Sequence, residues 1–225
     1  MGYHIDTGLI KEKFNNKCEC PLCEIKAIVE EQYLNEFHND AVMEDKTRIM
    51  VNKLGFCKEH FNKLIARQNK LSVALQISTR VNELKKFIRP ERSVKGAKKQ
   101  AEKALESGKS CILCDYVEES MIKYYKTVAQ MYNKEDDFYD QLKSTKGFCL
   151  EHYSMLIKYG RYAGLSQREY LCLLTEIQSK NISRLQRELK SFCDAHDYRN
   201  AYMLTGSAET ALPRMGEKLY GKNTK

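Results

Sequence analysis

The sequence predicts an all-α protein, for three reasons. Glycine is absent from four long stretches, and proline occurs only three times in 225 residues. Since these residues commonly end helices, long stretches without them favour helices. Apolar side chains recur within these stretches at the spacing of helices with one buried face. Alternating runs of β-branched residues closed by tight-turn sequences, which would indicate strands, are missing.

One cysteine pattern occurs twice in this helical chain. C-x-x-C is followed after a long gap by G-F-C-x-E-H, and the whole is then repeated. The four segments are residues 20–23, 55–60, 111–114 and 147–152. An internal repeat of this kind predicts related structural units. We therefore expect two three-helix repeats, each pinned by a metal, which pack as one globule with a long C-terminal helix.

The first repeat, residues 18–89, follows a short lead-in over 1–17. Apolar spacing predicts helices over about 24–37, 40–53 and 57–88. Asp40 is the expected cap of the second helix, and Pro90 ends the third. Residues 90–109 are expected to form a basic linker that is helical in its second half.

The second repeat, residues 110–163, is expected to form helices near 114–132, 136–145 and 149–159. A C-terminal helix over 164–203 follows. Ser166 and Glu169 at its start have the spacing of a capping box. The last segment, 204–225, contains three glycines and a proline, so we expect an irregular tail.

Each repeat contains the four ligands of a metal site. Cys3His is a regular ligand set of closed structural zinc sites. Nine cysteines in a chain without an apparent export signal also favour metal binding over disulfides. Closing each loop costs roughly 3 kcal/mol, far less than the about 10–16 kcal/mol that a structural zinc contributes. The sequence predicts two zinc ions, one on Cys20, Cys23, Cys57 and His60 and one on Cys111, Cys114, Cys149 and His152.

Two other interpretations of the cysteines stay open. One is an iron–sulfur cluster with mixed ligands, and the other is thiol redox or metal-handling chemistry. Cys18, which lies two residues before the first C-x-x-C pair, is the candidate accessory thiolate for such exchange. Cys193 and His196 repeat the C-x-x-H spacing, but no cysteine pair is left to complete a third site.

Glu59 and Glu151 each precede a predicted histidine ligand. They are candidate general bases, because a carboxylate beside zinc can activate water. A catalytic zinc keeps an open position, however, and four protein ligands close each predicted site. Both acids also suit the first turn of a helix, where negative charge is favoured. The sequence therefore weighs against an enzyme.

The expected function is that of a non-catalytic interaction or scaffold protein with an unknown protein partner. A nucleic-acid-binding module is an alternative, because the formal net charge is +8 and basic residues gather at 89–109 and 179–190. No apolar stretch is long enough to span a membrane, so no membrane partner is expected. The lack of a signal-peptide pattern favours a cytoplasmic protein.

The motifs also carry a family resemblance. Cys-Pro-Leu-Cys-Glu, Gly-Phe-Cys-x-x-His-Phe, the second such pair and a closing Asp-Tyr-Arg-Asn at 197–200 resemble an uncharacterised bacterial family common in anaerobic Firmicutes. The resemblance covers most of the chain. It implies a cytoplasmic bacterial protein of this size and no particular activity. Members of that family often continue with a segment containing Trp, which this chain lacks.

Overall fold

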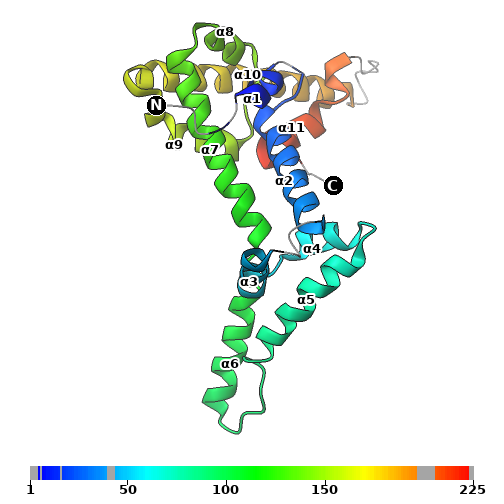
Figure 1. Ribbon diagram of the computed structural model, residues 1–225. Helices are drawn as coiled ribbons and strands as arrows, with labels where there is room; N and C mark the ends of the chain where they lie inside the picture. The colour runs from blue at the N-terminus through cyan, green and yellow to red at the C-terminus, as the bar shows by residue number, and fades with distance from the viewer. Residues whose placement is uncertain (1–4, 6, 16, 40–43, 197–205, 223–225) are drawn as a thin grey trace. The chain divides into compact units, whose positions relative to one another are not determined.

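The computed structural model describes residues 5, 7–15, 17–39, 44–196 and 206–222 (Figure 1). All regular elements in these ranges are helices, which confirms the predicted all-α class. The first half contains α1 (Gly8–Lys13), α2 (Pro21–Asn39), α3 (Asp45–Leu54), α4 (Lys58–Ile65), α5 (Lys70–Leu84) and α6 (Val94–Ser107). The second half contains α7 (Ile112–Lys134), α8 (Asp136–Ser144), α9 (Leu150–Lys158), η1 (Gly160–Ser166), α10 (Gln167–Ala195), η2 (Gly206–Ala208) and α11 (Ala211–Tyr220). Across the described ranges, every helix is too short or too polar to cross a membrane.

The chain forms two compact units whose bounds differ from those of the sequence repeats. Unit 1 comprises Met1–Ala27 and Met121–Lys225, and unit 2 comprises Ile28–Ser120. The boundaries fall within α2 and α7. The first 27 residues of the sequence thus group with the last 105. The sequence led us to expect a first repeat over 18–89 and a second over 110–163, packed as one globule. The bounds of these repeats differ from the bounds of the two compact units.

Unit 2 is built around side chains from α2, α3, α4 and α5 and from the start of α7. Its core includes Phe37, Val51, Leu64, Val73 and Ile112, all of which are buried. The rings of Phe37 and Phe56 meet edge to face, with their centroids 6.0 Å apart. This core holds the two loops of unit 2 that carry cysteines.

Unit 1 has its own aromatic core. Phe14 packs against Phe138 and Phe148, with ring centroids 5.7 and 5.9 Å apart. Helix α10 supplies Tyr170, which is fully buried and lies 5.2 Å from the ring of Tyr132. The C-terminal helix α11 packs on α9 and α10.

The predicted helix over 57–88 is wrong, since the chain breaks into α4 and α5. Asn69 caps α5 by accepting a hydrogen bond from the backbone N–H of Ser72. The face that α5 buries is also not the apolar stripe that the spacing indicated. Leu71 and Leu75 are 68% and 50% exposed, whereas the polar Gln76 and Arg80 point inward. Gln76 and Arg80 are buried because they donate hydrogen bonds to backbone carbonyls that would otherwise lack partners. The buried face of α5 therefore does not follow the apolar spacing.

The C-terminal part of the chain corrects two further expectations. Ser166 makes no side-chain cap, because its hydroxyl donates to Asn133 instead. The expected irregular tail contains α11 over Ala211–Tyr220. Pro213 fits there because it lies in the first turn, where backbone N–H groups have no partner within the helix. The expected cap Asp40 and the motif at 197–200 lie outside the described residues.

Candidate metal centres

Two groups of side chains gather with the geometry of metal ligands. The centre of unit 1 comprises Cys20, Cys23, Cys149 and His152, and the centre of unit 2 comprises Cys57, His60, Cys111 and Cys114. Within each group the ligand atoms all lie within 4.8 Å of one another. Each unit thus contains one complete Cys3His set.

All eight predicted ligands take part, but their pairing is the reverse of the one expected. The C-x-x-C pair of one repeat meets the C-x-x-H pair of the other. In unit 2, the backbone N–H of Ile112 donates to the carbonyl of Gly55 at 3.1 Å, and the Ser110 hydroxyl donates to the carbonyl of Leu54 at 2.7 Å. These bonds join loops from different repeats. Both pairings use the same motifs, so spacing alone could not separate them.

Helix starts position every ligand. Cys57 and Cys149 are the N-cap residues of α4 and α9, and their sulfurs accept the backbone N–H groups of His60 and His152. Helices α2 and α7 begin directly after Cys20 and Cys111 and carry the second cysteine in the first turn. Free N–H groups and the helix dipole favour negative charge at these places. Two helix N-termini therefore meet at each centre.

The glycine before each C-x-x-H pair has a positive φ, +69° at Gly55 and +82° at Gly147. Residues with a Cβ rarely adopt this conformation. At Gly147 an added Cβ would lie 2.9 Å from the Gln178 side-chain oxygen. Gln178 itself accepts from the Phe148 N–H and donates to the Phe148 carbonyl. Gly147 thus allows the loop to pass close to α10 and to place Cys149 at the centre of unit 1.

The interatomic distances match those of a single tetrahedral ion. Sulfur pairs are 3.7 Å apart for Cys23 and Cys149 and 3.8 Å apart for Cys57 and Cys114. The His152 Nδ1 lies 3.2–3.4 Å from its three sulfurs, and the His60 Nδ1 lies 3.3 Å from its own three. Bonds of about 2.3 Å to sulfur and about 2.0–2.1 Å to nitrogen would set sulfurs about 3.8 Å apart and sulfur about 3.5 Å from nitrogen. The residues present therefore fit one metal ion per centre.

The outer nitrogens of the two histidines differ. The His60 Nε2 lies 3.0 Å from a carboxylate oxygen of Glu30, which also accepts from Lys63 at 2.8 Å. A carboxylate in this place fixes the ring and increases the basicity of the ligating nitrogen. The His152 Nε2 is buried and has no hydrogen-bond partner in the described ranges. The tyrosine ring of Tyr125 lies 6.0 Å from the His152 ring.

The thiols at each centre cannot all ionise together. In unit 1, hydrogen bonds from Cys20 and Cys23 hold the pKa of Cys149 far below its usual range, while burial raises the pKa of Cys20. In unit 2, burial raises the pKa of Cys111, but His60 and nearby backbone N–H groups outweigh it and lower the pKa to about 6. Burial and the charge of Cys111 raise the pKa of Cys114. A divalent cation would supply the charge that three clustered thiolates need, and its binding would release protons.

Two buried cations hold the loops together, and sequence reasoning missed both. In unit 2, the Arg80 guanidinium donates to the carbonyls of Asn52, Lys53 and Ser107. In unit 1, the ammonium of Lys218, a fully buried side chain, donates to the carbonyls of Glu19 and Lys146. Each cation joins the segments that lead into the two halves of a centre. The only sequence signal for Arg80 and Lys218 is that each charged residue occupies a position on the otherwise apolar face of its helix.

Lys218 belongs to a network of charges around Glu19, which is 3% exposed. Arg184 donates to the Glu19 carboxylate at 2.7 Å, and Arg214 lies 3.3 Å from it. Burial raises the pKa of Glu19, but Arg184 and Lys218 outweigh it and lower the pKa. Burial lowers the pKa of Lys218, and the negative charge of Glu19 opposes this by favouring the charged form of the ammonium. A positive charge is thus buried beside the cysteines of unit 1.

The predicted accessory residues lie outside both groups of ligands. Glu59 is exposed, and Glu151 pairs with Lys26 on the surface at 3.3 Å. Neither carboxylate is among the clustered ligand atoms. Cys193 is exposed, and the Nδ1 of His196 lies 2.8 Å from the Phe192 carbonyl in its own helix.

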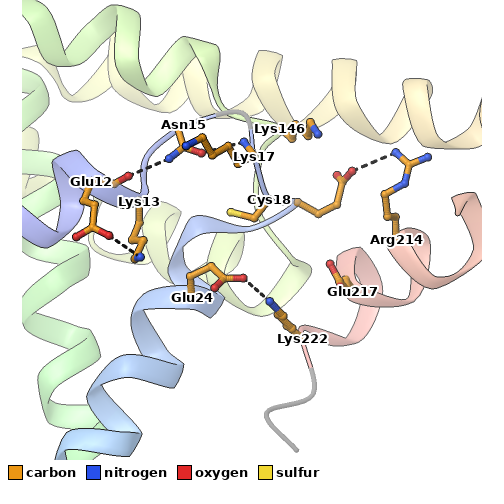
Figure 2. Close-up of a pocket in the computed structure, with 11 residues that line it drawn as sticks. Glu12, Lys13, Asn15, Lys17, Cys18, Glu24, Lys146, Arg214, Glu217 and Lys222 are labelled. Atoms are coloured by element: carbon orange, nitrogen blue, oxygen red, sulfur yellow. Dashed lines mark hydrogen bonds and ion pairs between the residues drawn. The ribbon is translucent and has the colours of Figure 1, made fainter. Parts of the chain in front are cut away.

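Cys18 is half-buried in a charged pocket of about 550 Å³ in unit 1 (Figure 2). Lys222 pairs with Glu24 at 2.5 Å on one side of it, and Lys13 pairs with Glu12 at 2.7 Å on another. Burial and the charge of Glu24 raise the pKa of the Cys18 thiol. The pocket therefore surrounds a thiol that lies apart from the four ligands of unit 1.

Comparison with known proteins identifies the family alone. A family model described as a family of unknown function, DUF6062, matches residues 1–225. The chain therefore belongs to this family. No curated protein and no solved structure matches it.

Proposed function

Within this family of unknown function, we propose that the chain is a scaffold whose two units are each closed by one Cys3His zinc ion. In this proposal the metals hold helix starts in place and present the helical surfaces to a partner, most simply another protein. The biological role is that of an interaction protein and not of an enzyme.

The observation that carries this proposal is the close approach of the ligand atoms. All four in each group lie within 4.8 Å of one another. An iron–sulfur cluster distributes its ligands over two or more irons, so their atoms lie farther apart than around one ion. Three thiolates and one imidazole are a regular ligand set of structural zinc. The geometry thus favours single zinc ions over clusters.

Two features support a non-catalytic role. Four protein ligands leave a tetrahedral ion no open position for water or substrate. The carboxylates considered as general bases are elsewhere: Glu59 is exposed, and Glu151 is ion-paired with Lys26. Zinc at these centres would then supply folding free energy and cross-links between helices.

The first experiment is to measure metal content and the visible spectrum of protein purified without oxygen. We expect two zinc ions per chain and no visible absorption band. Iron with a broad visible band would overturn the proposal in favour of electron transfer or redox sensing. A chain that binds neither metal would remove it altogether.

Nucleic-acid binding is a second candidate, favoured by the charge of unit 2. Residues 85–109 contain nine Lys or Arg and three Glu, so they carry +6 of the chain's net charge of +8. Helix α6 has no buried residue. Lys95, Lys98 and Lys99 on it form no ion pair with any residue that the structure describes. The other basic stretch, 179–190, is less available, because its Arg184 is paired with Glu19 and Glu188.

Fluorescence anisotropy with single- and double-stranded oligonucleotides tests this candidate. Binding should weaken steeply with salt, because each phosphate contact releases counterions. Changing Lys95, Lys98 and Lys99 together to Gln should reduce the slope of log K against log salt by about 2–3 on duplex DNA. The same change at Lys46, Lys53 and Lys70, which are exposed elsewhere in unit 2, should have little effect. Equal losses in both triple variants would argue against a defined interface.

A further inference from the structure

We propose that the two centres have different functions: unit 2 exchanges its metal readily with incoming thiol or chelating ligands, and unit 1 releases its metal only slowly. This inference rests on the proposed function, since it requires a metal at each centre. It makes the centre of unit 2 a site of metal transfer, with divalent zinc as the cargo.

Exposure of the ligands distinguishes the centres. All four ligands of unit 1 are buried, and none of their side chains is more than 6% exposed. In unit 2, Cys114 is exposed and Cys57 is half-buried, while His60 and Cys111 are buried. The same motif at the same helix starts therefore leaves one cysteine exposed in unit 2 and every candidate ligand buried in unit 1.

The end of α11 covers the centre of unit 1. A Cβ added at Gly221 would lie only 3.8 Å from the Cys23 sulfur and 3.9 Å from the Cys149 sulfur. The buried ammonium of Lys218, one turn earlier, anchors this cover to the carbonyls of Glu19 and Lys146. An incoming ligand can reach these sulfurs only after α11 has detached.

The centre of unit 2 is held firmly on one side and open on the other. Glu30 fixes the His60 ring through Nε2, and Cys111 is 3% exposed. An incoming thiolate can approach the metal beside the exposed Cys114. The bond from metal to incoming sulfur forms as the bond from metal to Cys114 sulfur breaks. The metal stays divalent and four-coordinate, and the released Cys114 thiolate takes a proton from water.

Repetition of this step at Cys57 would leave the metal bound to two incoming sulfurs, with His60 and Cys111 as the last ligands to leave. No electron is transferred, so the exchange needs no oxidant or reductant. The direction of transfer depends on the relative affinities and concentrations of the centre and the incoming ligand.

The test uses the full chain loaded with two zinc ions and an excess of the chromogenic chelator 4-(2-pyridylazo)resorcinol. We expect two release phases of one zinc each. The rate constant of the slow phase should be more than about tenfold smaller than that of the fast phase, because zinc release from unit 1 requires local opening of α11. Release of both ions in one phase would overturn the proposal and leave the proposed function intact. Absence of bound zinc at the start would instead refute the proposed function.

Alkylation assigns the phases without any mutation. Iodoacetamide added after the fast phase should label Cys57, Cys111 and Cys114 and leave Cys20, Cys23 and Cys149 unlabelled, as read by peptide mass spectrometry. Labelling of the unit 1 cysteines first would refute the proposal. The matched variants Cys114→Ser and Cys23→Ser, which alter equivalent positions of the two centres, should abolish the fast phase and the slow phase respectively.

Discussion

Glu30 is the residue that most clearly distinguishes one histidine ligand from the other. Its carboxylate contacts the His60 Nε2 at 3.0 Å and is 13% exposed, whereas the His152 Nε2 has no such contact among the described residues. Ligand-orienting carboxylates commonly change metal affinity when they are removed, because the imidazole loses both its orientation and part of its basicity.

We therefore predict that Glu30→Ala weakens zinc binding at unit 2 by about 10–100-fold and leaves unit 1 unchanged. Competitive titration against a chelator measures both affinities. The neighbouring Glu31→Ala is the control, since Glu31 pairs with Arg67 and is 59% exposed. Equal weakening by the two substitutions would show that Glu30 acts only through the local charge.

Glycine at 147 gives a second residue-scale prediction. Its φ of +82° and the 2.9 Å approach of the Gln178 oxygen leave no room for a side chain. Gly147→Ala should destabilise the zinc-loaded protein by about 1–3 kcal/mol through backbone strain. Denaturant unfolding measures this loss.

Gly216 supplies the matched control within α11. A Cβ there meets nothing within 4 Å, and the residue lies inside a helix. Gly216→Ala should therefore stabilise the protein, by up to about 1 kcal/mol. A loss of stability at Gly216, or none at Gly147, would contradict this account of the loop.

At the scale of elements, α11 attaches to unit 1 through charged side chains. Lys218 is fully buried and satisfies carbonyls from two loops, and Arg214 on the same helix pairs with Glu19 and Glu188. A buried group left without its partner loses hydrogen bonds that water cannot replace. The attachment of α11 is therefore polar, and it depends on a few residues.

Lys218→Met should destabilise unit 1 by about 3–5 kcal/mol, because it removes one partner of a buried charge network. Chemical denaturation of the zinc-loaded chain checks the magnitude. Lys222→Met should cost less than about 1 kcal/mol, since Lys222 is 47% exposed and its pair with Glu24 lies near the surface. Similar effects of both substitutions would indicate that Lys218 contributes no more than surface charge.

At the scale of the whole molecule, the pairing of the candidate ligands decides which parts of the chain a bound metal would tie together. In unit 1, residues separated by 126 positions share a centre, and in unit 2 the separation is 51 to 57. Because loop-closure entropy grows only with the logarithm of length, the longer loops cost roughly 1–2 kcal/mol more than pairing within each repeat. Packing of the helices easily outweighs that difference.

Metal counts in double variants of the full chain check this pairing. Cys20→Ser with Cys149→Ser should lose one zinc, because both ligands belong to unit 1. Cys20→Ser with Cys57→Ser should lose both, because each unit then lacks a ligand. Pairing within each repeat would give the opposite counts. Zinc content after gel filtration distinguishes the two outcomes.

The sequence by itself determined the helical class, the number of candidate centres and the eight residues that gather at them. Long stretches without glycine, together with helical apolar spacing, were sufficient for the helices, since both signals are local. The ligands were identifiable because C-x-x-C and C-x-x-H at helix starts are local as well. For the same reason the breaks near Gly55 and Gly147 followed from nearby residues, whereas α2 begins at Pro21, three residues before the start expected from apolar spacing.

Tertiary structure alone decided how the halves of each centre combine. Cys57 and Cys149 offer chemically identical ligands, so only the packing of their loops selects Cys111 for one and Cys20 for the other. The sequence could not predict that Arg80 and Lys218 are buried and join these loops. Their hydrogen-bond acceptors are backbone carbonyls, which every residue has, so no sequence pattern identifies them. The cover formed by α11 was missed because Pro213 and Gly216 suggested an irregular tail, while burial against unit 1 stabilises the helix. Short-range patterns thus determine local elements and ligand chemistry, whereas long-range packing determines which ligands meet and how exposed they are.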